Sequence, residues 1–238
     1  MLTPDEIIKE LGSVFSNKVD SIKYVEGETP KWQLPDVFKG VDPSTVLTTP
    51  PTNTSKTTLK EIKIVKDATE KRKKDKDFEK FVLEFDETPW KPFERRLLKN
   101  GFSQDKVDHM KFHFNNVWKN SKNLVKTFKH HFNRPRPAQI APFFGIEIDV
   151  LKTETHHTPA YPSGHVVIAY LMNKIVEDYT GSSCCKEFVG LMGAARIGQG
   201  VHYPSDNAAG VELGEFIWEK LYGVLYSVQN GVFRWVYE

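Results

Sequence analysis

Cysteine is scarce in this sequence: Cys184 and Cys185 are the only two among 238 residues, and they are adjacent. Neighbouring cysteines rarely bridge each other, because the geometry of such a bond is strained. The sequence therefore predicts no disulfide framework. That absence fits a reducing compartment or indifference to redox state.

Long apolar runs are missing as well. Nowhere does the sequence contain an uninterrupted stretch of the ~20 apolar residues that a membrane-spanning helix needs. The N-terminal stretch Met1–Glu6 lacks the basic and apolar regions of a signal peptide. We therefore expect a soluble protein, cytoplasmic where it is made, with no signal peptide and no transmembrane segment.

An excess of either charge is also absent, since 33 Lys and Arg residues stand against 31 Asp and Glu residues, for a net charge of +2. A general nucleic-acid binder would show a basic stripe or a much higher isoelectric point. The only dense basic run, Lys71–Lys74, is followed closely by Asp75 and Asp77. This mixture is typical of the solvated face of a charged helix or loop, so we expect no nucleic-acid partner.

The two parts of the chain differ in composition. Residues 27–58 are rich in Pro, Thr, Ser and Gly, which disfavour helix and predict a long extended connection. Residues 5–18 have helical spacing and predict a short helix before it. We divide the chain into an N-terminal extension with a Pro/Thr-rich linker, residues 1–58, and one helical domain, residues 59–238.

From residue 59 onward, apolar residues recur at helical spacing and strand signals are few. We expect helices to begin near residue 59 and to cover residues 105–132, 164–179, 185–198 and about 204–228. The pattern in the first of these four ranges allows one long helix or two helices broken near Asn120-Ser121. The fold class is predicted to be mainly α, a compact helical bundle with an irregular N-terminal extension.

Three short segments in the second half carry residues suited to phosphate chemistry. They are Lys129-x6-Arg136-Pro137, Pro162-Ser163-Gly164-His165 and Arg196-x5-His202-x3-Asp206. Together they supply three cations, two histidines and one carboxylate. A phosphoryl-transfer site without a metal needs this set: positive charge around the phosphate oxygens, a nucleophile, an acid for the leaving group and an anchor for the nucleophile.

The first segment places Lys129 near the end of the long predicted helix. Pro135 and Pro137 flank Arg136 and force the chain out of helix, so that a fixed guanidinium can bind two oxygens of one phosphate. The alternative is a lysine at a helix C-terminus and a surface arginine in a Pro-rich loop.

The second segment predicts a tight turn that enters a helix, with Ser163 as N-cap. The backbone N–H groups of Gly164 and His165 would then point out of the helix start, where anions bind. The Ser163 hydroxyl adds a donor, and His165 would lie close enough to donate a proton. An ordinary capped helix is the alternative.

In the third segment, Asp206 follows His202 by four residues and can turn back to it. A carboxylate on one imidazole nitrogen fixes the tautomer and raises the basicity of the other nitrogen, which suits a nucleophile. The alternative is a buried histidine satisfied by a nearby aspartate.

In their order and internal spacing, the three segments resemble those of the type 2 phosphatidic acid phosphatase superfamily, which includes bacterial non-specific acid phosphatases and vanadium haloperoxidases. The motifs span residues 129–206, and the flanking helices extend the similarity from about residue 60 to 228. One departure is Ala195, because the family usually has serine before the arginine of its third motif. Residues 1–58 have no family counterpart.

The resemblance implies a role for each motif residue and makes residues 59–238 a phosphatase-like catalytic domain. The phosphate-binding groups would be Lys129, Arg136, Arg196, Ser163 and the backbone N–H of Gly164. His202 would attack phosphorus and form a phosphohistidine, with Asp206 orienting it. His165 would protonate the leaving oxygen and then activate water. Such sites need no metal, and the sequence has no carboxylate cluster resembling a site for two metal ions.

These expectations lead to a metal-independent phosphomonoester hydrolase of the acid phosphatase type, acting on a small phosphorylated substrate without a cofactor. The oligomeric state is left open, with a homo-oligomer as one alternative. Vanadate would bind as an inhibitor. The first alternative is a vanadium-dependent haloperoxidase, in which vanadate is the cofactor and His202 coordinates it; the short chain favours the phosphatase. The second alternative is a non-catalytic phosphate-binding protein, for which only Ala195 speaks.

Overall fold

The structure is a computed structural model. It describes residues 4–27, 30–86, 90–152, 155–225, 227–229 and 232–234. The elements, in chain order, are α1 (Pro4–Asp20), η1 (Asp36–Phe38), α2 (Pro43–Val46), α3 (Lys56–Lys74), α4 (Lys76–Glu84), α5 (Trp90–Lys99), α6 (Gln104–Phe132), α7 (Pro137–Ile140), η2 (Ala141–Phe144), α8 (Gly164–Thr180), α9 (Glu187–Gly198), α10 (Pro204–Leu225), β1 (Ser227–Gln229) and β2 (Val232–Arg234).

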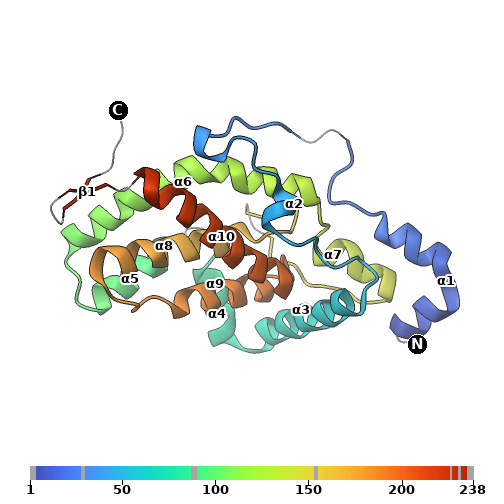
Figure 1. Cartoon of the computed structure of the whole chain (residues 1–238). Helices are drawn as coiled ribbons and strands as arrows, with labels where there is room; N and C mark the ends of the chain where they lie inside the picture. Colours follow the sequence, from blue (N-terminus) through green and yellow to red (C-terminus); the bar gives the residue numbers. More distant parts are fainter. Residues whose placement is uncertain are drawn as a thin grey trace.

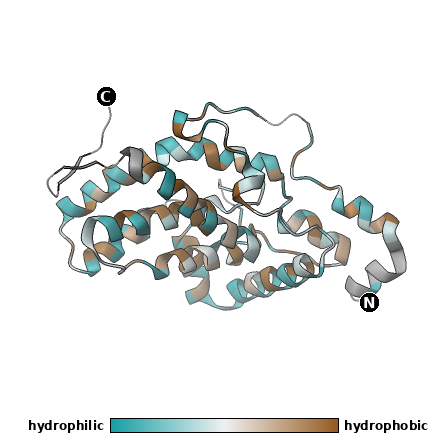
Figure 2. Ribbon diagram, viewed as in Figure 1, coloured by the Kyte–Doolittle hydropathy of each residue, from teal (hydrophilic) through white to brown (hydrophobic). Residues whose placement is uncertain are grey.

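Helix α8 lies at the centre of the fold and packs against α6, α9 and α10, while α3 and α4 pack against α9. Figure 1 shows α10 running beside α8, with the long α6 behind them. In Figure 2 the apolar residues gather on the central helices and the polar residues on the outer turns of α6. The predicted mainly α fold is confirmed. The long helix is unbroken at Asn120-Ser121.

Close packing of α10 on α8 depends on glycine. A Cβ atom on Gly210 would lie 2.8 Å from the carbonyl oxygen of Ser163 and 2.9 Å from the Cβ of Val166. Only glycine therefore lets α10 approach the N-terminus of α8 this closely. The approach brings the second and third motifs together.

Helix α6 ends at Asn133, whose φ of 46° is left-handed and whose N–H bonds the Lys129 carbonyl. The side chain of Asn133 also accepts a hydrogen bond from the N–H of Val25 and donates one to its carbonyl, which ties the N-terminal segment to this corner. The chain then continues as Arg134-Pro135-Arg136, so the end of α6 directs the first motif into the bundle.

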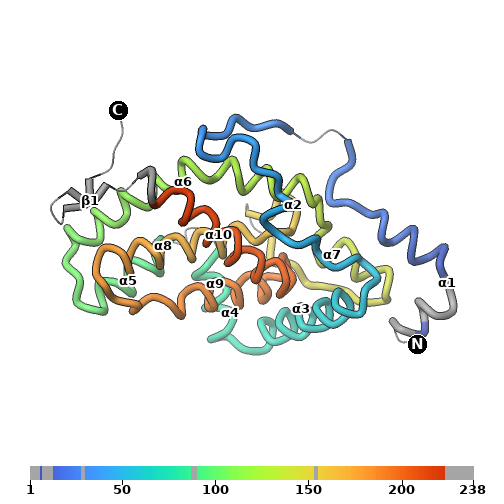
Figure 3. The backbone as a smooth tube through the Cα atoms, in the orientation of Figure 1, coloured from blue at the N-terminus to red at the C-terminus, as the bar shows by residue number. Residues whose placement is uncertain are grey.

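The N-terminal segment contributes to the core. Phe38 and Leu47 are buried in the main apolar cluster, and the hydroxyl of Tyr161 donates to the Thr48 carbonyl at 2.7 Å. Figure 3 traces this segment from α1 past the end of α6 to α3. Within the described residues no helix is both long enough and apolar enough to cross a membrane.

The C-terminal end of the last helix was predicted wrongly. Helix α10 ends at Leu225, and Val228 lies in strand β1, which pairs with β2 in an antiparallel ladder. The sequence carries a signal for this: Asn230-Gly231, the strongest short-range mark of a hairpin, precedes the β-prone Val232 and Phe233. Residues 230–231 themselves lie outside the described part of the chain.

Candidate active site

The three motifs meet at one cavity of about 270 Å³. Lys129 and Arg136 of the first motif, Gly164 and His165 of the second and His202 of the third all line it. They come from the end of α6, the turn before α7, the start of α8 and the loop before α10. Segments up to seventy-three residues apart, from Lys129 to His202, thus share one wall.

Arg136 is held rigidly at this cavity. Its Nε and Nη2 atoms both donate to the Thr158 carbonyl, at 2.9 and 2.7 Å, and Nη1 donates to the Val201 carbonyl at 2.6 Å. The same Nη1 lies 3.0 Å from Nε2 of His202. Arg136 as a whole is 6% exposed, and burial lowers the pKa of its guanidinium to about 10.

These contacts fix the tautomer of His202. A guanidinium can only donate, so Nε2 must be the acceptor and the ring proton must lie on Nδ1. Nδ1 is 3.1 Å from Oδ2 of Asp206, which accepts that proton in a hydrogen bond. The unprotonated nitrogen is therefore Nε2, the one beside Arg136.

The surroundings of His202 favour the neutral form of its imidazole. Burial, and then the positive charges of Arg136, Lys129 and Arg196, hold its pKa well below the usual value. A neutral imidazole with an unprotonated Nε2 is the nucleophilic form. The chain reaches this position through Gly200, whose φ of +82° and close neighbours Ile148 and Thr69 admit no side chain.

Lys129 stands in the last turn of α6 and is buried. Its Nζ donates to the carbonyls of Pro159 and Ala160, at 2.8 and 3.4 Å. Burial and then the charge of Arg136 lower its pKa well below the ordinary lysine value. Gly164 lies beside it, since a Cβ on this glycine would be 3.5 Å from Cε of Lys129.

Arg196 is wholly buried in α9. Its Nη1 donates to Oδ1 of Asp86 and to the Thr155 hydroxyl, both at 3.1 Å. Its Nε and Nη2 atoms have no partner among the described residues. Burial and then Arg136 lower its pKa to about 9. Asp86 thus holds one edge of the guanidinium and leaves two donors for an oxyanion.

Ser163 is the N-cap of α8, as predicted, but its side chain makes no capping bond. Its N–H bonds the Asp206 carbonyl at 2.9 Å, which joins the second motif to the third. Its hydroxyl is buried and unpartnered within the part of the chain described. This donor is a second group able to bind an oxyanion at the helix N-terminus.

His165 follows Gly164 in the first turn of α8 and lines the cavity. Burial, and next the charge of Arg196, hold its pKa well below the usual histidine value, while a hydrogen bond to the Asp86 backbone acts in the opposite direction. A bound phosphate dianion would counter these charges and raise the pKa of His165.

A buried polar network, missed by sequence reasoning, supports the third motif. Arg134 donates to Oδ1 of Asp206 at 2.6 Å and to the hydroxyl of Ser205 at 2.7 Å, and it pairs with Glu61 at 3.2 Å. Glu61 also accepts the Ser205 N–H at 2.7 Å. The Arg134 guanidinium stacks 3.9 Å from the ring centre of Tyr203. Asp206 is thus fixed on both oxygens.

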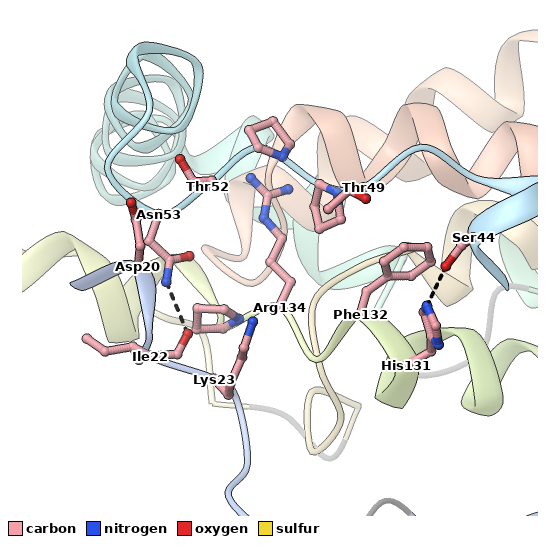
Figure 4. Close-up of a pocket in the computed structure, with 13 residues that line it drawn as sticks. Asp20, Ile22, Lys23, Ser44, Thr49, Thr52, Asn53, His131, Phe132 and Arg134 are labelled. Carbon is pink, nitrogen blue, oxygen red and sulfur yellow. Dashed lines mark hydrogen bonds between the residues drawn. The ribbon is translucent and has the colours of Figure 1, made fainter. Parts of the chain in front are cut away.

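The N-terminal segment closes over Arg134. Figure 4 shows Arg134 in the wall of a separate cavity of about 270 Å³, between Asp20–Asn53 and the chain around His131–Pro135. Asn53 bonds the carbonyls of Val19 and Ile22 there. The catalytic candidates of the third motif do not line this cavity. The segment therefore shields the network that orients Asp206.

The site gathers positive charge that an oxyanion could bind. The charge of Arg136 lowers the pKa of Lys129 and of Arg196, and the charge of Arg196 also lowers that of Lys129, so a bound dianion would relieve this repulsion. The carboxylates of Asp86 and Asp206 contact the cations and His202 without lining the cavity. Within the residues described, no group of three or more His, Cys, Asp or Glu side chains could hold a metal ion.

Comparison with known proteins agrees with this geometry. Residues 120–229 match the family model of the PAP2 superfamily, and this stretch contains all three motifs from Lys129 to Asp206. A search of the curated proteins found no match to the chain. PAP2 superfamily members are mostly phosphatases or related hydrolases. The part of the chain that carries the three motifs thus matches the PAP2 superfamily, the superfamily of type 2 phosphatidic acid phosphatases, over residues 120–229.

Proposed function

We propose that this protein hydrolyses phosphate monoesters without a metal, through a phosphohistidine on His202. The observation that carries the proposal is the state of His202: Nδ1 is held by Asp206 and Nε2 lies 3.0 Å from a cation at the wall of the cavity. An imidazole so constrained is a nucleophile with an oxyanion-binding group beside its reactive atom.

In the first step the Nε2 lone pair of His202 attacks phosphorus, and the bond from phosphorus to the leaving oxygen breaks. His165 gives its proton to that oxygen, so an alcohol departs. The imidazole becomes positively charged as the new P–N bond forms. The carboxylate of Asp206, 3.1 Å from Nδ1, stabilises that charge.

In the second step His165, now neutral, takes a proton from water while the water oxygen attacks phosphorus. The P–N bond breaks and its electron pair returns to Nε2. Inorganic phosphate leaves, and His165 is protonated again. The same residue thus acts as acid and then as base.

Cations replace a metal in this proposal. Lys129, Arg136 and Arg196 would bind the equatorial oxygens and stabilise the charge that develops in the transition state. The Nη1 of Arg136 exchanges its contact with Nε2 of His202 for a phosphate oxygen, which frees the lone pair. Ser163 and the N–H of Gly164 complete the cradle at the α8 N-terminus.

The test is hydrolysis of para-nitrophenyl phosphate in EDTA, with and without orthovanadate. We expect turnover that survives EDTA, is blocked by vanadate and is lost in His202→Ala. The matched control is His109→Ala, an exposed histidine of α6 that does not line the cavity. It should behave as wild type.

A trapping experiment tests the intermediate. His165→Ala should still react with an aryl phosphate, whose good leaving group needs little acid assistance, but should hydrolyse the phosphoenzyme slowly. Labelled phosphate should then accumulate on the protein in a bond stable to base and labile to acid. A wild-type protein without turnover that binds phosphate would contradict hydrolysis, and a bromide peroxidase assay with vanadate would test the haloperoxidase alternative.

A further inference from the structure

Two lysines that the phosphate chemistry does not use line the same cavity. Lys122 and Lys126 stand on α6 at positions seven and three residues before Lys129. Residues at this spacing share one face of a helix. With a rise of about 1.5 Å per residue, they lie about 10 Å and about 4.5 Å along the axis from Lys129. The cavity wall is thus a row of three amines.

The outer two amines have no internal counter-charge. No Asp or Glu is among the described residues that line the cavity. Neither lysine has an ion-pair partner in the described part of the chain, whereas Lys73 and Lys76 both pair with glutamates. Lys122 and Lys126 are exposed, while Lys129 is buried. Positive charge therefore extends from the buried phosphate cradle to the cavity mouth.

An apolar strip runs beside this row. Trp118 and Val125 of α6 and Ile168 of α8 line the cavity together with the two exposed lysines. Trp118 and Ile168 are half-buried, so part of each side chain is open to a ligand. The apolar part of a leaving group bound here would contact this apolar strip, and the ammonium groups of Lys122 and Lys126 would lie beside it.

We infer that the substrate carries a second anionic group, a phosphate or a carboxylate, on an apolar body about 5–10 Å from the phosphorus that is attacked, a span set by the helical rise. This deepens the proposed function and rests on it. The scissile phosphate occupies the buried cradle, the body of the leaving group contacts Trp118, and the second anion binds Lys122 and Lys126. Hydrolysis breaks the same phosphorus–oxygen bond as before.

The test compares three substrates with the same ring: phenyl phosphate, para-carboxyphenyl phosphate and hydroquinone bisphosphate. The wild-type protein should prefer the two with a second anion, through a lower KM. In Lys122→Ala/Lys126→Ala the ratio of their kcat/KM to that of phenyl phosphate should fall about twofold to thirtyfold, the range for two exposed ion pairs. Added salt should reduce the ratio in wild type only.

The matched control is Lys60→Ala/Lys63→Ala, which removes two exposed lysines of α3 and changes the net charge equally. It should leave the ratio unchanged. An equal preference for all three substrates in wild type would overturn the inference, as would equal losses in the two double variants. A preference for only the carboxylate or only the bisphosphate identifies which second anion the lysines bind.

Affinity measurements can test the anion subsite independently of catalysis. His202→Ala lacks the nucleophile, so calorimetry on it measures the affinity for hydroquinone bisphosphate and for phenyl phosphate without turnover. Tighter binding of the bisphosphate, lost in His202→Ala/Lys122→Ala/Lys126→Ala, supports the subsite even if the wild type hydrolyses neither compound. Equal affinities would reject the subsite whatever the rates are.

Discussion

Replacing Asp206 with asparagine tests the centre of the site. Three donors converge on this carboxylate: Arg134 Nη1 on Oδ1 at 2.6 Å, and the Tyr203 N–H and His202 Nδ1 on Oδ2 at 2.9 and 3.1 Å. Asparagine has nearly the same shape but only one accepting atom, and its NH2 group can only donate. At least one of the three donors must therefore lose its acceptor.

Both orientations of the new amide are unfavourable. With its oxygen toward Tyr203 and His202, the NH2 group faces the guanidinium of Arg134, donor against donor. With its oxygen toward Arg134, the NH2 group faces Nδ1 of His202, which must then accept. The ring proton would move to Nε2, where it blocks the lone pair and faces a donor of Arg136.

The magnitudes follow from these contacts. Removing one partner of a buried ion pair costs about 3–5 kcal/mol of folding stability; because Arg134 keeps Glu61, we expect about 3 kcal/mol. The wrong tautomer lowers the rate by about 10²–10⁴-fold, as an orienting aspartate does in serine proteases. We would measure urea unfolding by circular dichroism and kcat/KM for para-nitrophenyl phosphate, at a temperature where the variant remains folded.

Glu61→Gln is the control that separates stability from orientation. Glu61 bonds Arg134 and Ser205 but does not touch His202, so this variant should lose stability and keep most of its rate. Asp206→Asn with wild-type kcat/KM would refute the orienting role. Equal rate losses in both variants would show that general loosening, and not the tautomer, sets the rate.

Three further outcomes follow from the site. Asp86→Asn should lower kcat/KM about tenfold or more, because it removes the carboxylate that pairs with Arg196, and losing one charged partner typically costs ~1.5–3 kcal/mol. An unchanged kcat/KM would contradict a role for this pairing. The pKa values of His165 and His202 both lie below 6.5 in the free protein. After correction for substrate ionisation, kcat/KM should therefore peak below pH 6.5 and fall as rising pH deprotonates the general acid, His165. A maximum in alkaline solution would refute the acid role of His165. Gly210→Ala should destabilise the fold by about 1–3 kcal/mol in urea unfolding through overpacking against α8, and unchanged stability would show that the helices can separate.

The sequence predicted the long helices and the motif residues that line the cavity, because both signals are local. Helical spacing repeats within one turn, and each motif fixes its own residues within a few positions. The partners Glu61, Arg134 and Asp86 could not be found this way. Each pairs across at least seventy positions, and nothing in the local pattern tells a buried charge from a solvated one.

Arg134 illustrates the limit. It stands two residues before Arg136 in a run of alternating arginine and proline, and the two side chains have different tasks. Arg136 lines the cavity, whereas Arg134 turns to Asp206 and Glu61 beneath the N-terminal segment. The local sequence pattern gives no difference between the two arginines. Their different contacts depend on how distant segments pack around them.

The placement of charge explains how one cavity could both bind phosphate and react with it. Asp86 pairs with Arg196 and Asp206 with Arg134, and neither carboxylate lines the cavity. The cavity wall therefore stays positive while the paired side chains keep fixed positions. A dianion entering this face exchanges its water for preorganised donors and needs little rearrangement of the protein. The same contacts leave Nε2 of His202 uncharged and unprotonated beside Arg136. An oxyanion that draws Arg136 toward itself would thereby expose the nucleophile only when there is phosphorus to attack.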